Sequence, residues 1–321
     1  MNTIKNQFRL IAGIFLCTVF IINVSCSKDD GTSESELPTA IDPPSPEPTE
    51  ESEVKTGSRT IISEDQERHY ILRVPKSYTK EKKMPLVLVL HGYSSTNDAI
   101  EKYTGFSALG EKEGFISIYP LGTRDDRNNS FWTIGGTIEW NGKRYNDQVL
   151  ITDIIESAKE ELSIDEKRIY LVGNSNGGFM THRFGAEQTD QVSAIAIMAG
   201  LMPKNVPAFA KGKLPVLHLH GLQDTIVSPR ELPEESRVFS LGSTLGYWLR
   251  NSEIPAETKP DILRNDEDVT ILEWKSSPAL VGDLKYIRAN KAGHMWFKEN
   301  NVAKIDATRE IWEFFKAHPK Q

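Results

Sequence analysis

The fold is decided by residues 168–178, which read RIYLVGNSNGG. The apolar run Ile169–Val172 is rich in β-branched and aromatic side chains and is typical of a buried strand. It leads into G-x-S-x-G at residues 173–177, a pattern in which a sharp strand-to-helix turn lifts a serine hydroxyl clear of a sheet. Gly173 and Gly177 suit this turn, because a side chain at either of them would collide with the turn or with the following helix. Ser175 is therefore the candidate nucleophile, although a bare G-x-S-x-G also occurs in ordinary strand–loop–helix connections.

Strands and helices are expected to alternate on both sides of this stretch. The continuous apolar run Pro85–Leu90 is typical of a central parallel strand that is buried on both faces. The other expected elements are a hairpin at 59–62 and 68–74, a helix at 97–113 interrupted near Gly105, a strand at 115–119, helices at 147–162 and 177–188, strands at 192–198 and 215–219, a helix at 241–249, a strand pair at 269–274 and 284–289, and a helix at 305–317. Residues 121–146 show no clear periodicity and are interpreted as one long functional loop. This alternation predicts an α/β fold with a mostly parallel central sheet and helices on both faces.

The first 57 residues do not resemble the rest. Lys5 and Arg9 precede an apolar run from Leu10 to Val24, as in a secretory signal of residues 1–25. Cys26 then follows at the place where a bacterial lipoprotein signal carries the cysteine that becomes lipidated. The acidic residues after it resemble the export signal of surface lipoproteins. Residues 26–57 are rich in Pro, Ser, Thr and Glu, which predicts a disordered tether, so the catalytic domain is expected at 58–321.

The charge argues against a nucleic-acid-binding protein, and the cysteine content argues against a domain held by disulfides. The net charge is −7, and residues 27–57 carry nine acids against two bases, so the predicted domain itself is nearly neutral. No basic face is present to attract nucleic acid. Cys17 and Cys26 are the only two cysteines, and both lie before the domain, so its core is expected to hold without an internal disulfide.

Three reactive residues are expected beyond the carboxyl ends of parallel strands, where active groups of such sheets collect. Ser175 follows its strand directly, Asp224 follows the strand at 215–219, and His294 follows the strand at 284–289. A serine hydroxyl needs an imidazole to accept its proton, and the imidazole needs a carboxylate to hold its tautomer. Alone, Asp224 could be a turn-former and His294 a surface histidine, but the order Ser, Asp, His is that of the α/β-hydrolase fold. The rival acids are Asp261, Asp266, Asp268 and Asp283, none of which directly follows the penultimate parallel strand.

An ester-cleaving site also needs N–H donors for the oxyanion of the tetrahedral intermediate. The backbone N–H of Asn176, next after the nucleophile, is the first expected donor. The second is expected from the loop after Pro85–Leu90, and Tyr93 is the candidate because the turn at His91-Gly92 bends that backbone inward. His91 itself is interpreted as structural.

Taken together, these motifs resemble the polyhydroxybutyrate depolymerase and feruloyl esterase group of α/β-hydrolases, which is like carbohydrate esterase family 1. The resemblance rests on His91-Gly92 and on residues 173–178, 218–224 and 293–296, and it extends over residues 68–316. It implies a secreted serine esterase whose relatives include feruloyl and acetylxylan esterases. The family has three glycines after the His-Gly turn where this chain has Tyr93-Ser94-Ser95, and its members often carry disulfides.

Two further groups of residues have alternative interpretations. His218 and His220 could form a metal pair on one strand face, but no third ligand is nearby in sequence, so core packing is favoured and no metal or other cofactor is expected. Trp132, Trp140 and Trp296 could form an aromatic floor for a sugar or phenolic ring, or could simply pack in the core.

The sequence therefore predicts a lipid-anchored serine esterase of the outer membrane or cell surface. It would remove feruloyl or acetyl groups from plant polysaccharide through an acyl-enzyme on Ser175. A polyhydroxyalkanoate depolymerase or a prolyl-oligopeptidase-like peptidase remains an alternative, because this fold hosts all of these activities. A catalytically inactive surface binding protein is the alternative from another class, and three reactive groups at three strand ends argue against it.

Overall fold

The computed structural model describes residues 56–320 apart from 141, 231 and 278–280. The predicted signal segment, Cys26 and nearly all of the predicted tether lie outside the described residues. Contacts within the chain separate residues 1–51 from residues 52–321. None of the helices described is long and apolar enough to cross a membrane.

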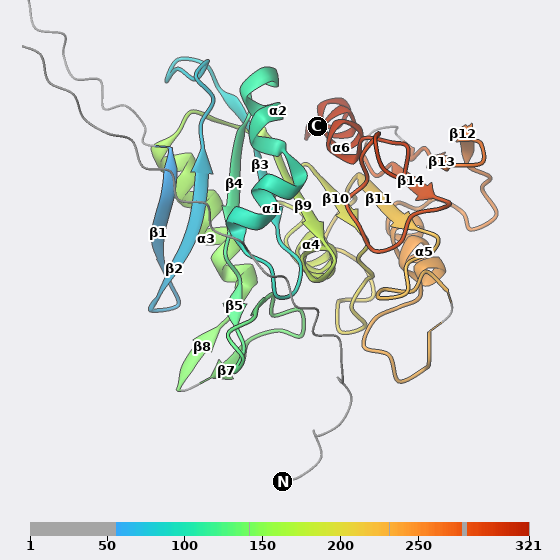
Figure 1. Ribbon diagram of the computed structural model, residues 1–321, viewed down its shortest axis with the longest axis horizontal. Coiled ribbons are helices and arrows are strands. Elements are labelled where there is room, and N and C mark those ends of the chain that lie inside the picture. Colours follow the sequence, from blue (N-terminus) through green and yellow to red (C-terminus); the bar gives the residue numbers. More distant parts are fainter. Residues whose placement is uncertain (1–55, 141, 231, 278–280, 321) are drawn as a thin grey trace, which may run out of the picture. The chain divides into compact units, whose positions relative to one another are not determined.

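A sheet of ten strands forms the centre of the described domain, in the order β1-β2-β4-β3-β9-β10-β11-β14-β13-β12 (Figure 1). Its strands are β1 (Gly57–Ser63), β2 (Gln66–Arg73), β3 (Met84–Leu90), β4 (Ile116–Pro120), β9 (Ile164–Asn174), β10 (Ala194–Met198), β11 (Val216–Gly221), β12 (Asp261–Asn265), β13 (Val269–Trp274) and β14 (Leu284–Ala289). The strands from β4 to β14 in this order pair in parallel, and the pairs at both edges are antiparallel. The mostly parallel sheet predicted from the sequence is confirmed.

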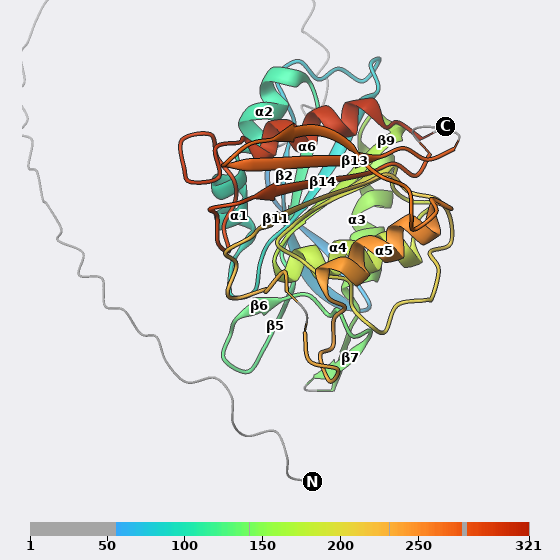
Figure 2. The same ribbon diagram turned by 90° about the vertical axis from the view of Figure 1, so that its right-hand side faces the viewer.

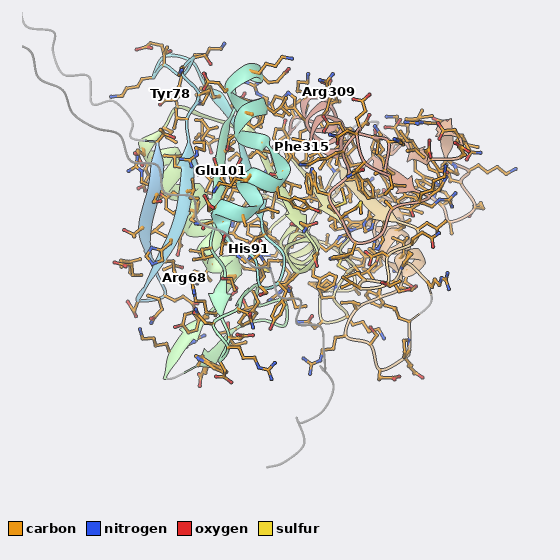
Figure 3. All side chains as sticks on the ribbon, viewed as in Figure 1. Arg68, Tyr78, His91, Glu101, Arg309 and Phe315 are labelled. Carbon is orange, nitrogen blue, oxygen red and sulfur yellow. The ribbon has the colours of Figure 1, made fainter. Side chains whose placement is uncertain are left out.

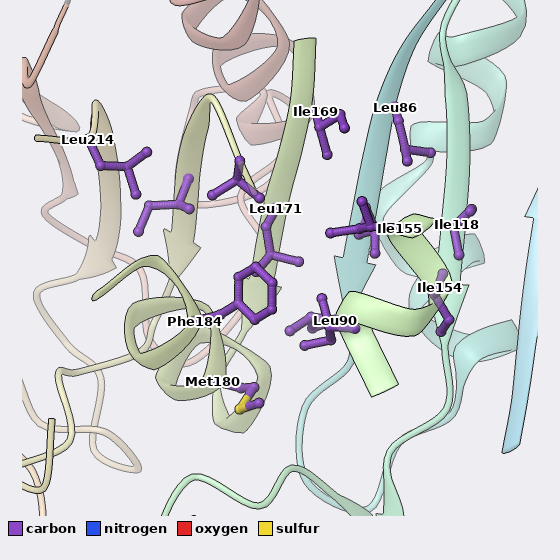
Figure 4. Packing of buried hydrophobic residues seen from close by; sticks show 14 of the residues in the cluster. Leu86, Leu90, Ile118, Ile154, Ile155, Ile169, Leu171, Met180, Phe184 and Leu214 are labelled. Atoms are coloured by element: carbon purple, nitrogen blue, oxygen red, sulfur yellow. The ribbon is translucent and has the colours of Figure 1, made fainter. Parts of the chain in front are cut away.

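Helices cover both faces of this sheet because its central strands are apolar on both faces. Along β3, Leu86, Leu88 and Leu90 point into one core and Val87 and Val89 into the other. The first core also takes residues from α3 (Asp147–Glu161), α4 (Asn176–Glu187) and α5 (Leu241–Asn251). Figure 2 shows the three helices, and Figure 4 shows core side chains of α3 and α4. The second takes residues from α1 (Asn97–Thr104), α2 (Phe106–Glu113) and α6 (Ala307–Ala317). The side chains of the strands thus alternate between two helical layers.

The predicted hairpin at the sheet edge and the predicted break between α1 and α2 are both present. Glu64 and Asp65, which join β1 to β2, have φ values of 48° and 60°, as a tight two-residue hairpin turn requires. Gly105 ends α1 in the left-handed conformation with φ 75° and lets α2 start in a new direction.

One expectation was wrong, and one strand was not predicted. Residues 121–146 are not one irregular loop but contain two short hairpins, formed by β5 (Thr123–Arg124) with β6 (Ser130–Phe131) and by β7 (Ile138–Trp140) with β8 (Lys143–Tyr145). Strand β12 was not predicted, because its side chains are mostly exposed and lack the alternation of a half-buried strand.

Candidate active site

Ser175 occupies the turn between β9 and α4, in a backbone conformation that is unusual for a residue with a side chain. Its φ is 54° and its ψ is −119°, and its N–H donates to the Met198 carbonyl at 2.8 Å. The two neighbouring glycines make this turn sterically feasible. A Cβ on Gly177 would lie 2.6 Å from the Leu90 carbonyl oxygen, and a Cβ on Gly173 would overlap the carbonyl of Gly177. The turn therefore presents the serine hydroxyl at a half-buried, accessible position.

Ser175, His294 and Asp224 come together beyond the carboxyl ends of β9, β14 and β11. Nε2 of His294 lies 2.9 Å from Oγ of Ser175, and Nδ1 of His294 lies 2.7 Å from Oδ2 of Asp224. With the proton of the imidazole on Nδ1, facing the carboxylate, Nε2 is free to accept the proton of the serine. The geometry is that of a nucleophile, a general base and an orienting acid in series.

The side chain of Asp224 is buried, and both of its carboxylate oxygens have hydrogen-bond partners. Its Oδ1 accepts hydrogen bonds from the N–H groups of Ile226 at 2.9 Å and Val227 at 2.8 Å, and Nε2 of His220 lies 3.4 Å from its Oδ2. Burial raises the pKa of Asp224, but the bonds from His220, His294 and Val227 outweigh it and hold that pKa well below its usual range. The carboxyl group is thus kept ionised beside His294.

The rival acids have partners of their own. Asp283 bonds Ser276 and Lys275 at the start of β14, the end of that strand opposite His294. Asp268 pairs with Lys291 at 2.8 Å, and Asp266 pairs with Arg264 at 2.6 Å. Neither these three nor Asp261, which opens the edge strand β12, takes the place of Asp224 next to His294.

A row of buried imidazoles extends from Asp224 into the core. It contains His218 and His220, for which the sequence favoured core packing, and His182, which the sequence did not point to. Nδ1 of His220 lies 3.2 Å from Nε2 of His218, and the His218 ring stacks on His182 with centroids 5.5 Å apart. Trp248 closes the row by donating from Nε1 to Nδ1 of His182 at 3.0 Å. Burial lowers the pKa of His182 to about 3 and the pKa of His218 well below its ordinary value, so both rings stay neutral. Among the residues the structure describes, no group of three or more potential ligands is arranged to hold a metal ion.

The loop after β3 lies against the nucleophile. A Cβ built on Gly92 would be 3.4 Å from Cβ of Ser175, so the next residue, Tyr93, begins within the site. In the described part of the chain, the N–H groups of Tyr93 and Asn176 donate to no other group. The side chain of Tyr93 is 55% exposed, and its hydroxyl donates to Asp125 at 2.7 Å. Both predicted oxyanion donors therefore have a free N–H near Ser175.

Two of the three tryptophans do not fit the predicted aromatic floor. The rings of Trp132 and Trp296 are each 1% exposed, so no substrate ring can stack on them. Trp296 packs edge-on against Phe106 and donates to Thr308 at 2.9 Å, which is a core position. Trp140, on β7, is half-buried. The interpretation of Trp132 and Trp296 as a substrate-binding floor is corrected, because sequence alone does not show which way a loop turns its aromatic side chains.

Comparison with known proteins bears directly on this geometry. The family model described as "Putative esterase" matches residues 62–276. The chain belongs to this esterase family. The matched residues include Ser175 and Asp224, while His294 lies beyond them.

Three curated relatives of the chain are named as an acetylxylan esterase/xylanase, a polyhydroxyalkanoate depolymerase and a feruloyl esterase. The chain is 31% identical over 150 residues to a bifunctional acetylxylan esterase/xylanase of Neocallimastix patriciarum, covering 46% of this chain and 20% of that protein. It is 33% identical over 118 residues to poly(3-hydroxyalkanoate) depolymerase C of Paucimonas lemoignei, covering 36% and 28%. It is 26% identical over 168 residues to a protein of Aspergillus terreus described as probable feruloyl esterase C, covering 50% and 56%. The chain thus spans less than two thirds of each of these relatives.

The fold of the chain is shared with a solved acetyl xylan esterase from Aspergillus awamori. The two superpose with a TM-score of 0.62 over 81% of this chain and 99% of that one, at 15% sequence identity. This likeness supports the fold alone, and it confirms the predicted α/β-hydrolase architecture.

Proposed function

We propose that this esterase hydrolyses carboxylic esters through an acyl-enzyme on Ser175. The observation that carries the proposal is the unbroken series of contacts from Ser175 through His294 to Asp224, at 2.9 and 2.7 Å. Each distance is within hydrogen-bond reach, as proton transfer requires.

The chemistry follows from the positions of the protons. His294 takes the hydroxyl proton as Oγ attacks the ester carbonyl, and the N–H groups of Tyr93 and Asn176 bind the oxyanion that forms. His294 then gives its proton to the departing alcohol, and the acyl group remains on Ser175. Water, deprotonated by His294, attacks the acyl-enzyme and releases the carboxylic acid. Asp224 stays ionised throughout and stabilises the imidazolium.

The proposed substrates are feruloyl or acetyl esters of plant polysaccharide. The support is the family and two relatives named as acetylxylan and feruloyl esterases. A second candidate is a polyhydroxyalkanoate, which the relative named as a depolymerase favours. A panel of aryl acetates, feruloylated and acetylated xylan fragments, hydroxybutyrate oligomers and peptides tests this choice. The acylated glycans should be turned over fastest and peptides not at all. Faster turnover of hydroxybutyrate oligomers or peptides would refute the substrate class but leave Ser175 as the nucleophile.

The proposed location is the outer membrane or cell surface, with the domain held by acyl chains on Cys26. An acyl chain contributes about 0.8 kcal/mol of membrane affinity for each buried methylene, which an acidic tether could not supply. A random-coil chain of about 30 residues has an average end-to-end distance of roughly 30 Å, so an enzyme anchored through such a chain would meet polymers brought to the cell.

Labelling with fatty acid tests this anchor. The full-length protein should take up labelled fatty acid and sediment with membranes, and Cys26→Ala should do neither. Unlabelled wild-type protein in the growth medium would exclude the anchor without bearing on the catalytic residues.

A further inference from the structure

Trp132 connects the two backbone segments that carry the proposed oxyanion donors. Its indole N–H donates to the carbonyl of His91 at 2.7 Å, two residues before Tyr93. Its own backbone N–H donates to Oδ1 of Asn176 at 2.7 Å. Trp132, which is buried and directly follows β6, therefore holds the loop after β3 and the first turn of α4 at the same time.

The contact with His91 is reinforced from two further sides. The His91 ring packs on the Trp132 ring with centroids 4.9 Å apart. Its Nε2 accepts a hydrogen bond from the N–H of Gly122 at 3.0 Å, so Nδ1 carries the proton and donates to the Gly92 carbonyl at 2.8 Å. His91, whose place beyond the end of β3 is marked in Figure 3, is thus fixed at its ring and at its carbonyl. The turn that presents Tyr93 cannot relax without breaking these bonds.

We propose that Trp132 is a positioning residue that sets the distance between the N–H groups of Tyr93 and Asn176, and hence the geometry of the oxyanion hole. The inference rests on the proposed function, because it concerns the same site. Oxyanion donors act only when they lie about 2.7–3.1 Å from the charged oxygen. A small movement of either segment therefore weakens binding of the transition state more than binding of the substrate. Trp132 touches no substrate in this arrangement and acts through the two segments that it holds.

Ser94, in the loop after β3, is held by the same segment of chain that carries Trp132. Ser94 has a φ of 60°, and its N–H donates to the Ser130 carbonyl at 2.8 Å, two residues before Trp132. The hydroxyl of Ser94 also bonds Asn129 at 2.9 Å. Residues 129–132 therefore hold the loop after β3 at Ser94 as well as at His91.

The test compares Trp132→Phe with Trp312→Phe in the full-length protein. Phenylalanine keeps most of the ring but loses the indole N–H. Trp312, on α6, is a matched control because it is also buried and its indole N–H donates to Glu113 of α2 at 3.1 Å. We expect kcat on an aryl acetate to fall about 10- to 100-fold in Trp132→Phe with KM within about twofold, and Trp312→Phe to keep the parent values.

Inhibitor binding separates positioning from a general loss of structure. A trifluoromethyl ketone forms an adduct on serine that carries the oxyanion, so its affinity for Trp132→Phe should fall in parallel with kcat/KM, while the affinity for the carboxylate product stays constant. Asn176→Ala, which removes the other contact of Trp132, should lower kcat in the same way and covers the case in which Trp132→Phe does not fold.

The outcomes are distinct. Unchanged kcat in both Trp132→Phe and Asn176→Ala, or equal losses of kcat in Trp132→Phe and Trp312→Phe, would overturn the positioning role. Ser175→Ala, measured in the same series, reports on the proposed function itself. If that variant stays active, the acyl-enzyme proposal fails. If it is inactive while Trp132→Phe and Asn176→Ala both match the parent, only the positioning role fails.

Discussion

At the scale of single residues, Asp224 contacts both His294, the proposed base, and His220, the first of the buried imidazoles. It faces His294 at 2.7 Å and His220 at 3.4 Å, and two backbone N–H groups fix its other oxygen. The low pKa that results keeps the carboxylate charged and its orientation constant. Its role is therefore to hold Nδ1 of His294 protonated and the ring in position, so that Nε2 faces the serine.

Replacing Asp224 by asparagine should keep this geometry but favour the wrong tautomer of His294. In triads of this kind the change lowers turnover by about 10⁴. Steady-state kinetics on an aryl acetate measure the loss. Asp268→Asn is the matched control, since Asp268 pairs with Lys291 outside the site and its replacement should leave kcat unchanged. A loss in Asp268→Asn with Asp224→Asn unaffected would transfer the role of the acid.

At the scale of elements, the turn between β9 and α4 depends on backbone packing that only glycine permits. Gly173→Ala forces a Cβ into the backbone of Gly177, so the turn must shift. We expect a loss of about 1–3 kcal/mol in the free energy of unfolding and nearly complete loss of activity. Urea denaturation and an esterase assay test both expectations.

Gly242→Ala provides the comparison for this variant. Gly242 lies in α5, and a Cβ there would have no atom within 4 Å. Alanine should therefore raise stability by about 0.5–1 kcal/mol, because it restricts the unfolded chain and favours the helix. Equal stability in the two variants would show that the turn tolerates a side chain.

The elements that the sequence predicted are those with long, regular patterns. Runs such as Pro85–Leu90 and the helical spacing in residues 147–162 identify buried strands and an amphipathic helix, and the ends of such strands put Ser175, Asp224 and His294 at one edge of the sheet. The short strands β5 to β8 span two or three residues each, too few for a period to show. They are ordered by contacts far along the chain, such as those of Asp147 with Thr123 and Thr133.

The same limit applies to the imidazole row and to the position of Trp132. His182 and Trp248 lie 66 residues apart in sequence, and Trp132 and Asn176 lie 44 apart, so no local pattern links them. The spacing of His220 and Asp224 was visible, but only the structure shows the second histidine beside the carboxylate. Sequence reasoning thus finds groups at strand ends and misses the residues that support them from other elements.

At the scale of the whole molecule, burying neutral histidines makes stability depend on pH. The pKa of His182 is lowered to about 3, and burial also lowers the pKa values of His218 and His91. Below about pH 6.5 the unfolded chain binds protons that the folded chain excludes, so stability is full above that pH and falls on acidification. Each such histidine lowers the free energy of unfolding by up to about 1.4 kcal/mol for each pH unit of acidification.

His182→Gln should flatten this dependence between about pH 6 and 4.5, a window in which ordinary carboxyl groups titrate alike in the parent and the variant. Glutamine keeps an acceptor for Trp248 but does not titrate, so the slope should decrease by about one proton even if the variant is less stable at every pH. Urea midpoints across the window give the slope. An unchanged slope would mean that His182 titrates alike in the folded and unfolded states.

The central claim is that Ser175 is the covalent nucleophile of this esterase. Its most direct test is reaction of the full-length protein with a fluorophosphonate ester, followed by peptide mass spectrometry. The account predicts one adduct, on Ser175, formed in step with the loss of esterase activity and absent from Ser175→Ala, which should itself be inactive because it lacks the covalent route. An adduct on another residue, or activity of Ser175→Ala within tenfold of the parent, would contradict it.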